Sequence, residues 1–435
     1  MKNIDELRNR LLDLPNGYIS KKLIANKNYY YLKYYENGKQ ISKYIKSCEL
    51  ETIRKQLLER KQIEKTINEY DSKRRNLAKL SKRAKSLTGD IMCGDIKVAT
   101  FLNGKLVTKN DKLCPLFIKR TNNVSEYLKT RVIDSSRTNS RLLKKILNIN
   151  TQKDEQISLY VYGAVITDNY WFKPKGSKLK FKDIGFDADY YNDLTLKGEL
   201  MFYPKTVKHT PQLTLTGSFE KCWKKIDDEW WLYKKGTTEQ KFSEIFCSLL
   251  AKELNIATAL YDLDDGYIRT KNFATHYNFE PMIGLVGDDE SYDTIFNALL
   301  GINEQLASQY LLLSFFDCII NNIDRHNENL GLLRDKKTGR IMSLAPNFDN
   351  NLALLGYDKN LKMAPHNDGQ IKLFIRFIRS NAKAREEFKR LNIAPLNEKN
   401  IENCLNSTPI KLVDFNIGKY ILGRYEYIVR FKETI

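Results

Sequence analysis

The chain has 435 residues, 42% of them hydrophobic, and its 72 Lys and Arg outnumber 53 Asp and Glu, which gives a formal net charge of +19. This length predicts two or three domains, and the basic balance favours an anionic partner such as nucleotide, nucleic acid, a membrane surface or an acidic protein, without choosing among them. The sequence contains no apolar run near the roughly 20 residues of a membrane span, no signal-peptide pattern in MKNIDELRNR and no CxxC pair among its seven cysteines. These features argue against membrane insertion, a disulfide framework and a zinc site, and they favour the cytoplasm.

Residues 1–90 form a basic segment, with 22 Lys and Arg against 11 Asp and Glu, an excess of +11. Tyr29 to Ile45 (YYYLKYYENGKQISKYI) is typical of a β-hairpin, because aromatic and β-branched residues flank Asn37-Gly38, a pair that suits a two-residue turn. Apolar residues at helical spacing from Glu49 to Tyr70 predict an exposed helix that ends in the basic run SKRRNLAKLSKRAKS. Two interpretations remain open: a solvated helix with a small packing hairpin, or a module that docks nucleic acid or another partner.

Residues 91–205 predict a mixed α/β domain. One stretch, Val124 to Leu147, has helical character, and three runs are strand-like: Ile96 to Leu102, Leu106-Val107 and Ile157 to Ile166. No residues in this part of the sequence have the spacing of metal ligands or of a catalytic nucleophile and its base. We therefore expect its aromatic residues to form a hydrophobic core.

From residue 206 onward, strand-like segments give way to helical ones. The strand-like runs are Gln212 to Thr216 and Trp230 to Lys234, and the helical ones are Lys241 to Leu254 and Asn297 to Ile320. The expected fold is therefore α+β and bilobal, like that of a protein kinase. It has a strand-rich N-lobe at 206–275 and a helical C-lobe at 276–435, and the basic hairpin-plus-helix module is an addition to it.

The strongest chemical signal is the segment NNIDRHNENLG, residues 321–331, in which Asp324 and Asn329 stand five residues apart in loop-forming sequence. Strand-like runs at 330–333 and 340–345, joined by a turn at 335–339, predict a hairpin that brings the chain back. Asp349 is then expected beside Asn329, although 20 residues separate them.

Phosphoryl transfer needs this set of groups, namely one carboxylate for the proton of the attacking hydroxyl and hard oxygen ligands for Mg²⁺. Asp324 suits the first role, and Asn329 with Asp349 suits the second. Asn/Asp-rich segments also make ordinary turns and caps, but the two motifs together favour a catalytic centre that uses ATP and Mg²⁺.

The order D-R-H-N-x-N followed by x-F-D resembles the HipA-like serine/threonine kinases and, more distantly, the phosphatidylinositol kinases. Three segments upstream favour the HipA-like side. One is similar to that family's short phosphate loop, Gly217-Ser218-Phe219-Glu220-Lys221. The second, WWLYK ending at Lys234, resembles the strand that presents the family's ATP-contacting lysine. The third, Ser243-Glu244, resembles the start of its Glu-bearing helix. The resemblance covers roughly residues 206 to 355, whereas residues 1–205 do not match the usual N-terminal portion of HipA.

The resemblance implies roles for further residues. Lys234 would contact the phosphates and be held by Glu244, and His326 would join the catalytic set as a hydrogen-bonding partner that organises the loop. Lys235 competes with Lys234, but side chains alternate along a strand and Leu232 would share the face of Lys234, which favours Lys234. The nucleotide-binding set is expected to be Gly217, Ser218, Lys221, Lys234, Arg269 and Asn272, the last two from the segment where the adenine-binding hinge would lie.

The expected activity is transfer of the γ-phosphate of ATP to a Ser or Thr of a protein substrate. The chain itself is included among the acceptors, through Thr214, Thr216 or Ser218 near the phosphate loop. Two alternatives stay open: a small-molecule or lipid kinase, and a nucleic-acid-binding regulatory protein whose kinase-like domain senses nucleotide.

Overall fold

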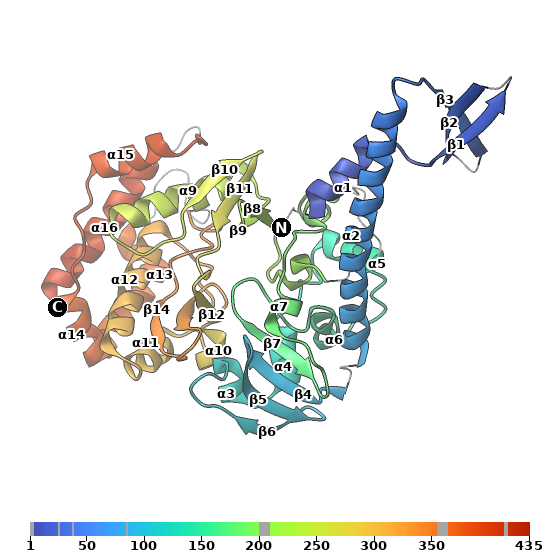
Figure 1. The fold of residues 1–435 in the computed structure, drawn as a ribbon. Helices are drawn as coiled ribbons and strands as arrows, with labels where there is room; N and C mark the ends of the chain where they lie inside the picture. The colour runs from blue at the N-terminus through green and yellow to red at the C-terminus, as the bar shows by residue number, and fades with distance from the viewer. Residues whose placement is uncertain are drawn as a thin grey trace. The chain divides into compact units, whose positions relative to one another are not determined.

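The computed structural model describes residues 4–24, 27–36, 39–83, 86–199, 209–354, 364–412 and 416–435 (Figure 1). These residues group into two compact units, one ending at Lys79 and one beginning at Leu80. The boundaries of the four predicted domains stay predictions. Among the described helices, none combines the length and apolar character needed to cross a membrane.

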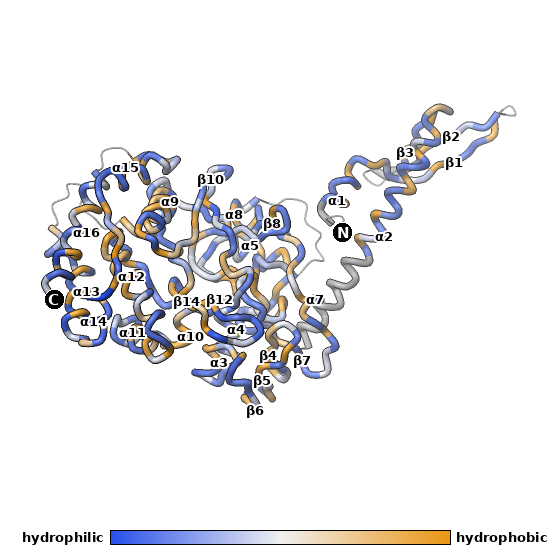
Figure 2. Tube along the Cα trace, turned by 60° about the vertical axis from the view of Figure 1, so that its left-hand side comes forward, coloured by the Kyte–Doolittle hydropathy of each residue, from blue (hydrophilic) through white to orange (hydrophobic). Residues whose placement is uncertain are grey.

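The first unit contains helix α1 (Ile4–Asp13), the antiparallel sheet β1-β2-β3 and most of the long helix α2 (Leu50–Arg83). The predicted hairpin is confirmed as β2 (Lys27–Glu36) and β3 (Lys39–Ile45), and the structure adds β1 (Tyr18–Ile24) to its edge. The predicted Asn37-Gly38 turn lies outside the described residues. The predicted helix is also confirmed, but α2 runs past the expected end at Tyr70. Polar and apolar residues alternate along the coloured part of α2 in Figure 2.

The second unit begins with an antiparallel sheet in the order β6-β5-β4-β7. Its strands are β4 (Gly89–Cys93), β5 (Ile96–Leu102), β6 (Lys105–Lys109) and β7 (Tyr170–Pro174). Buried Ile91, Phe101 and Phe172 form the core between this sheet and its helices, of which α3 (Leu116–Thr121) and α4 (Val124–Lys129) are the first two. The short helices α7 (Phe181–Ile184) and α8 (Asn192–Lys197) follow.

Two predictions for this region are wrong. The single helix expected over 124–147 is divided into α4 and α5 (Thr138–Ile146), because Asp134 turns the chain by accepting a hydrogen bond from the Ser136 amide at 2.8 Å. The strand expected over 157–166 is α6 (Asp154–Ser158) followed by the 3₁₀ turn η2 (Leu159–Val161). Tyr162 and Gly163 end that turn with φ of 57° and 65°, in the left-handed region that a strand does not visit.

A second antiparallel sheet, in the order β10-β11-β9-β8, forms the strand-rich lobe with helix α9 (Thr238–Glu253). Its strands are β8 (Lys221–Ile226), β9 (Glu229–Lys234), β10 (Tyr261–Asp264) and β11 (Tyr267–Lys271). The strand predicted at 212–216 is wrong, because Thr210 caps a 3₁₀ turn, η3 (Pro211–Thr214), that begins with proline. Gln212 instead uses its side chain to dock this turn on β8, bonding the backbone N and O of Trp223 at 2.9 and 2.7 Å.

The helical lobe surrounds α12 (Glu304–Ile320), whose C-terminal half is buried on every side, with Leu311, Phe315 and Ile319 among its buried residues. The helix predicted over 297–320 is divided into two: residues 297–300 are the end of α11 (Tyr292–Leu300), and the rest is α12, which Asn303 caps by accepting from the Leu306 amide. The helices around α12 also include α13 (Gly369–Ser380), α14 (Ala382–Arg390), α15 (Glu398–Ser407) and α16 (Ile417–Thr434).

The hairpin predicted after the central loop is confirmed as β13 (Gly331–Asp335) and β14 (Ile341–Leu344). Strand β12 (Tyr277–Pro281) completes this third sheet, and the one-turn elements α10 (Ile283–Val286) and η4 (Pro365–Asn367) lie outside it. The hairpin returns the chain toward the loop before it, which is the geometry that the central motif needs.

Glu280 on β12 connects the 91–205 segment to the helical lobe. Its buried carboxylate accepts hydrogen bonds from the Leu116 amide and, at 3.0 Å, from the Tyr170 hydroxyl, and it forms an ion pair with Arg334. Removing one partner of a buried ion pair leaves the other charge uncompensated. The segment before residue 206 is thus bonded to the kinase-like part rather than appended to it.

We expect Glu280→Ala to lower the free energy of unfolding by about 3–5 kcal/mol, because Arg334 would stay buried without its carboxylate. Glu386→Ala, at an exposed position of α14, is the matched control and should change that free energy by no more than about 0.5 kcal/mol. Urea unfolding followed by tryptophan fluorescence measures both. Equal midpoints for the two variants would contradict the role given to Glu280.

Candidate active site

One cavity of about 430 Å³ collects most of the side chains that the sequence singled out. Nine of them line it: Gly217, Ser218, Lys221, Lys234, Asn272, Asp324, His326, Asn329 and Asp349. Residues from the 91–205 segment line it as well, among them Tyr127 and Asp134 and the ion pair between Arg131 and Asp168, whose atoms approach to 2.7 Å. The cavity is therefore built from three stretches of chain within the second unit.

Lys234 is a buried cation that lines this cavity. Its Nζ lies 2.6 Å from Glu244 Oε1 on α9 and 2.8 Å from Asp349 Oδ1, and its side chain is 4% exposed. The neighbouring Lys235 is exposed, and Leu232 lines the cavity beside Lys234. Strand alternation therefore identified the lysine that points inward.

Lys234, Glu244 and Asp349 form a trio in which the pKa of each group depends on the charges beside it. Although burial opposes it, Asp349 and Glu244 raise the pKa of Lys234 well above its ordinary value. Burial likewise works against ionisation of Asp349, but Lys234 and Lys221 hold the pKa of Asp349 down at about 2. Burial, with the nearby Asp349 charge, raises the pKa of Glu244 despite its bond to Lys234, because one lysine is shared by two carboxylates.

The backbone around Asp349 fixes its direction. Asp349 adopts a φ of 59°, and the next amide, that of Asn350, donates to Glu244 Oε2 at 2.7 Å. A non-glycine residue in the left-handed region is uncommon and persists only where its surroundings hold it there. Here Glu244 does so, since it binds both the Asp349 partner Lys234 and the residue that follows Asp349.

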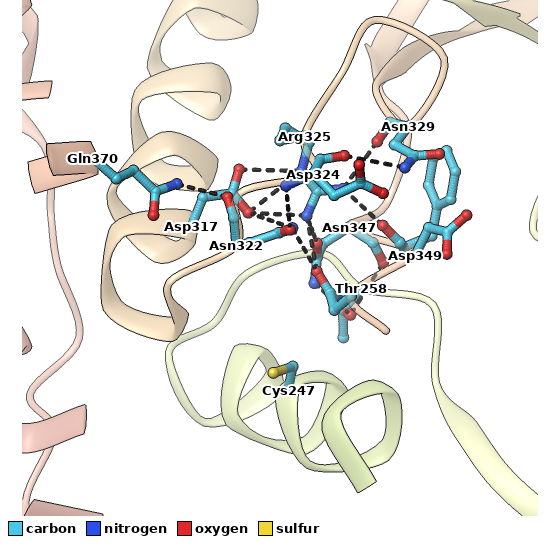
Figure 3. A network of polar contacts seen from close by, with 12 residues as sticks. Cys247, Thr258, Asp317, Asn322, Asp324, Arg325, Asn329, Asn347, Asp349 and Gln370 are labelled. Atoms are coloured by element: carbon cyan, nitrogen blue, oxygen red, sulfur yellow. Dashed lines mark hydrogen bonds and ion pairs between the residues drawn. The ribbon is translucent and has the colours of Figure 1, made fainter. Parts of the chain in front are cut away.

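Arg325 holds the loop that carries Asp324 (Figure 3). Its buried guanidinium forms an ion pair with Asp317 of α12 at 2.9 Å and donates to the carbonyl oxygens of Asn329 and Phe348 at 2.9 and 2.7 Å. Although burial opposes it, Asp317 raises the pKa of Arg325. The same arginine thus joins the metal-ligand candidates Asn329 and Asp349 through their neighbouring backbone.

Asp324 lies at the edge of this network with its carboxylate facing the cavity. Its backbone amide donates to Asn322 Oδ1 at 3.1 Å, and its carbonyl accepts from Asn329 Nδ2 at 3.1 Å. Burial raises the pKa of Asp324, with His326 opposing and Asp349 adding to the effect. In the part of the chain that the structure describes, no donor is bonded to its carboxylate, so the group is available to accept a proton.

The Gly217 loop is anchored by Arg137, a residue that sequence reasoning missed. Gly217 adopts a φ of 81°, and the 2%-exposed Arg137 donates to the carbonyl oxygens of Leu215, of Thr216 at 2.8 Å and of Gly217 at 2.7 Å. The backbone amide of Asn139, two residues on, donates to Glu220 Oε1 at 3.2 Å. Backbone acceptors leave no trace in a sequence pattern, so nothing in the sequence could have identified this arginine.

Lys221 ends the same motif and is buried beneath the loop. A Cβ on Gly217 would come within 2.9 Å of its Nζ, so the two residues are in close contact. Burial, with Lys234 and Arg137 nearby, lowers the pKa of Lys221 to about 7, although Asp349 opposes this. The loop therefore covers a cationic group whose proton is easily lost.

Arg269 lies apart from the other predicted residues. Its guanidinium is bonded to Asp262 at 2.7 Å and to Asp264 at 3.2 Å and lies over the Trp231 ring, and it does not line the cavity. Asn272, from the same segment, does line it. The sequence analysis also missed Asp317. Its position in the apolar run LLLSFFDCII could have indicated a buried ion pair, because buried charges are normally paired.

Comparisons with known proteins bear on the fold and on the N-terminus. The HipA of Shewanella oneidensis MR-1, solved as a complex with HipB and its operator DNA, aligns with a TM-score of 0.50 at 13% identity over 80% of this chain and 99% of that one. The proinflammatory kinase CtkA of Helicobacter pylori aligns with a TM-score of 0.37 at 16% identity over 49% of this chain and 93% of that one. Residues 2–55 match the model of a domain of unknown function, DUF6788, and no curated protein sequence matches. The likeness to HipA confirms the expected α+β, HipA-like kinase fold.

Arg137→Lys is expected to loosen the Gly217 loop, since a lysine keeps the charge but loses the planar fork that reaches three carbonyl groups. Two lost hydrogen bonds of about 1 kcal/mol each predict amide hydrogen exchange in residues 214–220 that is faster by about tenfold or more. Arg141→Lys, on the exposed face of α5, is the control and should exchange like the unmodified chain. Unchanged exchange in Arg137→Lys would exclude an anchoring role.

Proposed function

We propose that the chain is a kinase that transfers the γ-phosphate of ATP, with Mg²⁺, to a Ser or Thr of a protein. The observation that carries this proposal is the trio in which Lys234 bonds both Glu244 and Asp349, in one cavity with the open carboxylate of Asp324. These are the groups that phosphoryl transfer requires, and they lie in a HipA-like kinase fold.

Each residue has a distinct part in this proposal. Lys234 and Lys221 neutralise phosphate charge, and backbone N–H groups of the Gly217 loop approach the phosphates. Asp324 accepts the proton of the acceptor hydroxyl as that oxygen forms its bond to the γ-phosphorus. The bond between the γ-phosphorus and the bridging oxygen breaks, and ADP leaves with the bonding pair.

The donor set fits Mg²⁺. Asn329 and Asp349 offer the amide and carboxylate oxygens that this ion prefers, and Mg²⁺ needs only one or two carboxylates because it keeps several waters. Asn329 uses its amide nitrogen on the Asp324 carbonyl, which leaves the oxygen end for a cation. Asp349 uses Oδ1 for Lys234 and retains Oδ2 as a second donor oxygen. When bound, the ion would neutralise charge on the transferred phosphate.

A hydroxyl of the chain itself is included among the acceptors. Of the three candidates near the loop, Thr216 and Ser218 are exposed, whereas Thr214 is buried and donates its hydroxyl to the Pro211 carbonyl at 2.7 Å. Self-phosphorylation is therefore proposed for Thr216 or Ser218 in preference to Thr214.

Asp324→Asn should lower the rate of phosphotransfer by about 10²- to 10⁴-fold while nucleotide binding is retained, because the proton acceptor is lost. Asp349→Ala should also weaken Mg²⁺-dependent nucleotide binding. The chain is incubated with radiolabelled ATP and either a mixture of proteins or small hydroxyl compounds, and the labelled product identifies the class of acceptor. Intact-protein mass spectra report self-phosphorylation.

Asp228→Asn, an exposed turn position between β8 and β9, is the control and should keep full activity. If the unmodified chain transfers phosphate and Asp324→Asn does so equally well, the role of Asp324 is wrong. Transfer to small hydroxyl compounds alone would replace the protein kinase with a small-molecule kinase.

Nucleotide binding should be accompanied by proton uptake at Lys221. With a pKa of about 7 this lysine is mostly neutral at pH 8, and a phosphate beside it favours the charged form, which raises its pKa in the complex. Calorimetric titration with ATP and Mg²⁺ at pH 8, in buffers of different ionisation enthalpy, should show uptake that approaches one proton. Lys221→Met should abolish that uptake, and equal uptake in both proteins would assign the proton to another group.

A further inference from the structure

The sheet of the first unit has an unusual composition. Its three strands contain seven of the 25 tyrosines of the chain and six lysines, against a single acidic residue, Glu36. Figure 1 shows this sheet beyond the N-terminal end of α2, within the same unit. The phosphotransfer proposal uses none of these residues.

The strand register sorts these residues onto two faces. Tyr31 lies opposite Ser20 and Tyr44, Tyr29 opposite Lys22, and Lys33 opposite Tyr18. Because side chains alternate along a strand, directly paired positions share a face. We call this set the aromatic face: Tyr18, Lys22, Tyr29, Tyr31, Lys33 and Tyr44.

The other face is the packed one. It carries the buried side chains Leu32 and Ile45, and Arg54 of α2 lies over the Tyr30 ring at 5.7 Å. The aromatic face is left to solvent instead, with Tyr18 51% and Tyr44 49% exposed. The tyrosines of the aromatic face therefore lie together outside the packed core of the unit.

The rings of the aromatic face are close neighbours. The Tyr44 centroid lies 5.7 Å from that of Tyr31 and 6.2 Å from that of Tyr29, and Lys22 Nζ lies 5.6 Å from the Tyr31 centroid. The register places Gln40 and Ser42 on the same face, and no acidic residue lies on it among the described positions. Stacking surfaces are thus interleaved with positive charge.

We propose that the aromatic face binds single-stranded nucleic acid. Tyrosine rings on an open sheet stack with unpaired bases, and lysines between them neutralise the phosphates of the same strand. A duplex hides the faces of its bases within the stack, so these rings favour a single strand. A partner protein would find no acidic residue among the described residues of this face to pair with its own cations, whereas a polyanion needs none.

The test uses the full-length chain and fluorescence anisotropy with labelled oligo-dT and oligo-U of about 12 nucleotides, and a duplex of the same length. Both single strands are expected to bind more tightly than the duplex, and the comparison of dT with U tells DNA from RNA. Tyr44→Ala should weaken binding about tenfold, whereas Tyr44→Phe, which keeps the ring, should bind like the unmodified chain.

Lys21 and Lys22 supply a charge-matched pair, since both are exposed but the register places them on opposite faces. Lys22→Ala should weaken binding and reduce the slope of log K against log salt by about 0.7, and Lys21→Ala should leave both nearly unchanged. Equal effects of the two lysine variants, equal binding by Tyr44→Ala and Tyr44→Phe, or duplex binding as tight as single-strand binding would overturn the proposal. Circular dichroism melts of each variant verify that the sheet is intact.

Discussion

The ion pair between Arg325 and Asp317 is the interaction on which the rest of the site depends. A guanidinium presents five donors in one plane, and Arg325 uses them on α12, on its own loop and on the segment before Asp349. Asn347 and Asn350 add side-chain acceptors at 2.6 and 2.8 Å. Since these acceptors flank Asp324 and Asp349 in sequence, one buried arginine fixes both carboxylates relative to α12. A lysine, with one compact ammonium group, has no such reach.

Lys234 supplies the second constraint, and its arrangement has a direct electrostatic meaning. One lysine between two ionised, buried carboxylates leaves the trio with a net negative charge. Burial and the Asp349 charge raise the pKa of Glu244, whereas, although burial opposes it, Lys234 and Lys221 keep the pKa of Asp349 low. A bound cation at Asp349 would compensate this excess and release Lys234 toward an anion. Under the proposed function, the cavity would therefore favour a metal and a phosphate together over either alone, and this linkage is the physical reason for proposing them as a pair.

Spacing and alternation predicted the parts of the site that one continuous segment or strand determines. The loop around Asp324, the returning hairpin and the inward direction of Lys234 all follow from such local rules. Arg137 could not be predicted, because its partners are carbonyl oxygens 78 to 80 residues away, which any sequence supplies. The strand expected at 212–216 failed for a local reason, since the Thr210 cap and Pro211 favour a 3₁₀ turn over the apolar alternation. Long-range contacts and caps, not propensity, decided these cases.

The excess positive charge is concentrated in residues 1–90, and this distribution separates the proposed nucleic-acid binding from the proposed phosphotransfer. Residues 1–90 hold an excess of +11 and the remaining residues hold 50 Lys and Arg against 42 Asp and Glu, an excess of +8. The cations Lys234 and Arg131 of the cavity are already paired with carboxylates of the same site, Lys234 with Glu244 and Asp349 and Arg131 with Asp168. Binding of nucleotide therefore gives no account of the basic N-terminus. A surface that meets a polyanion does, because each neutralised phosphate releases counterions and so requires an uncompensated cation. The lysines beside the exposed tyrosines of β1, β2 and β3 meet that requirement.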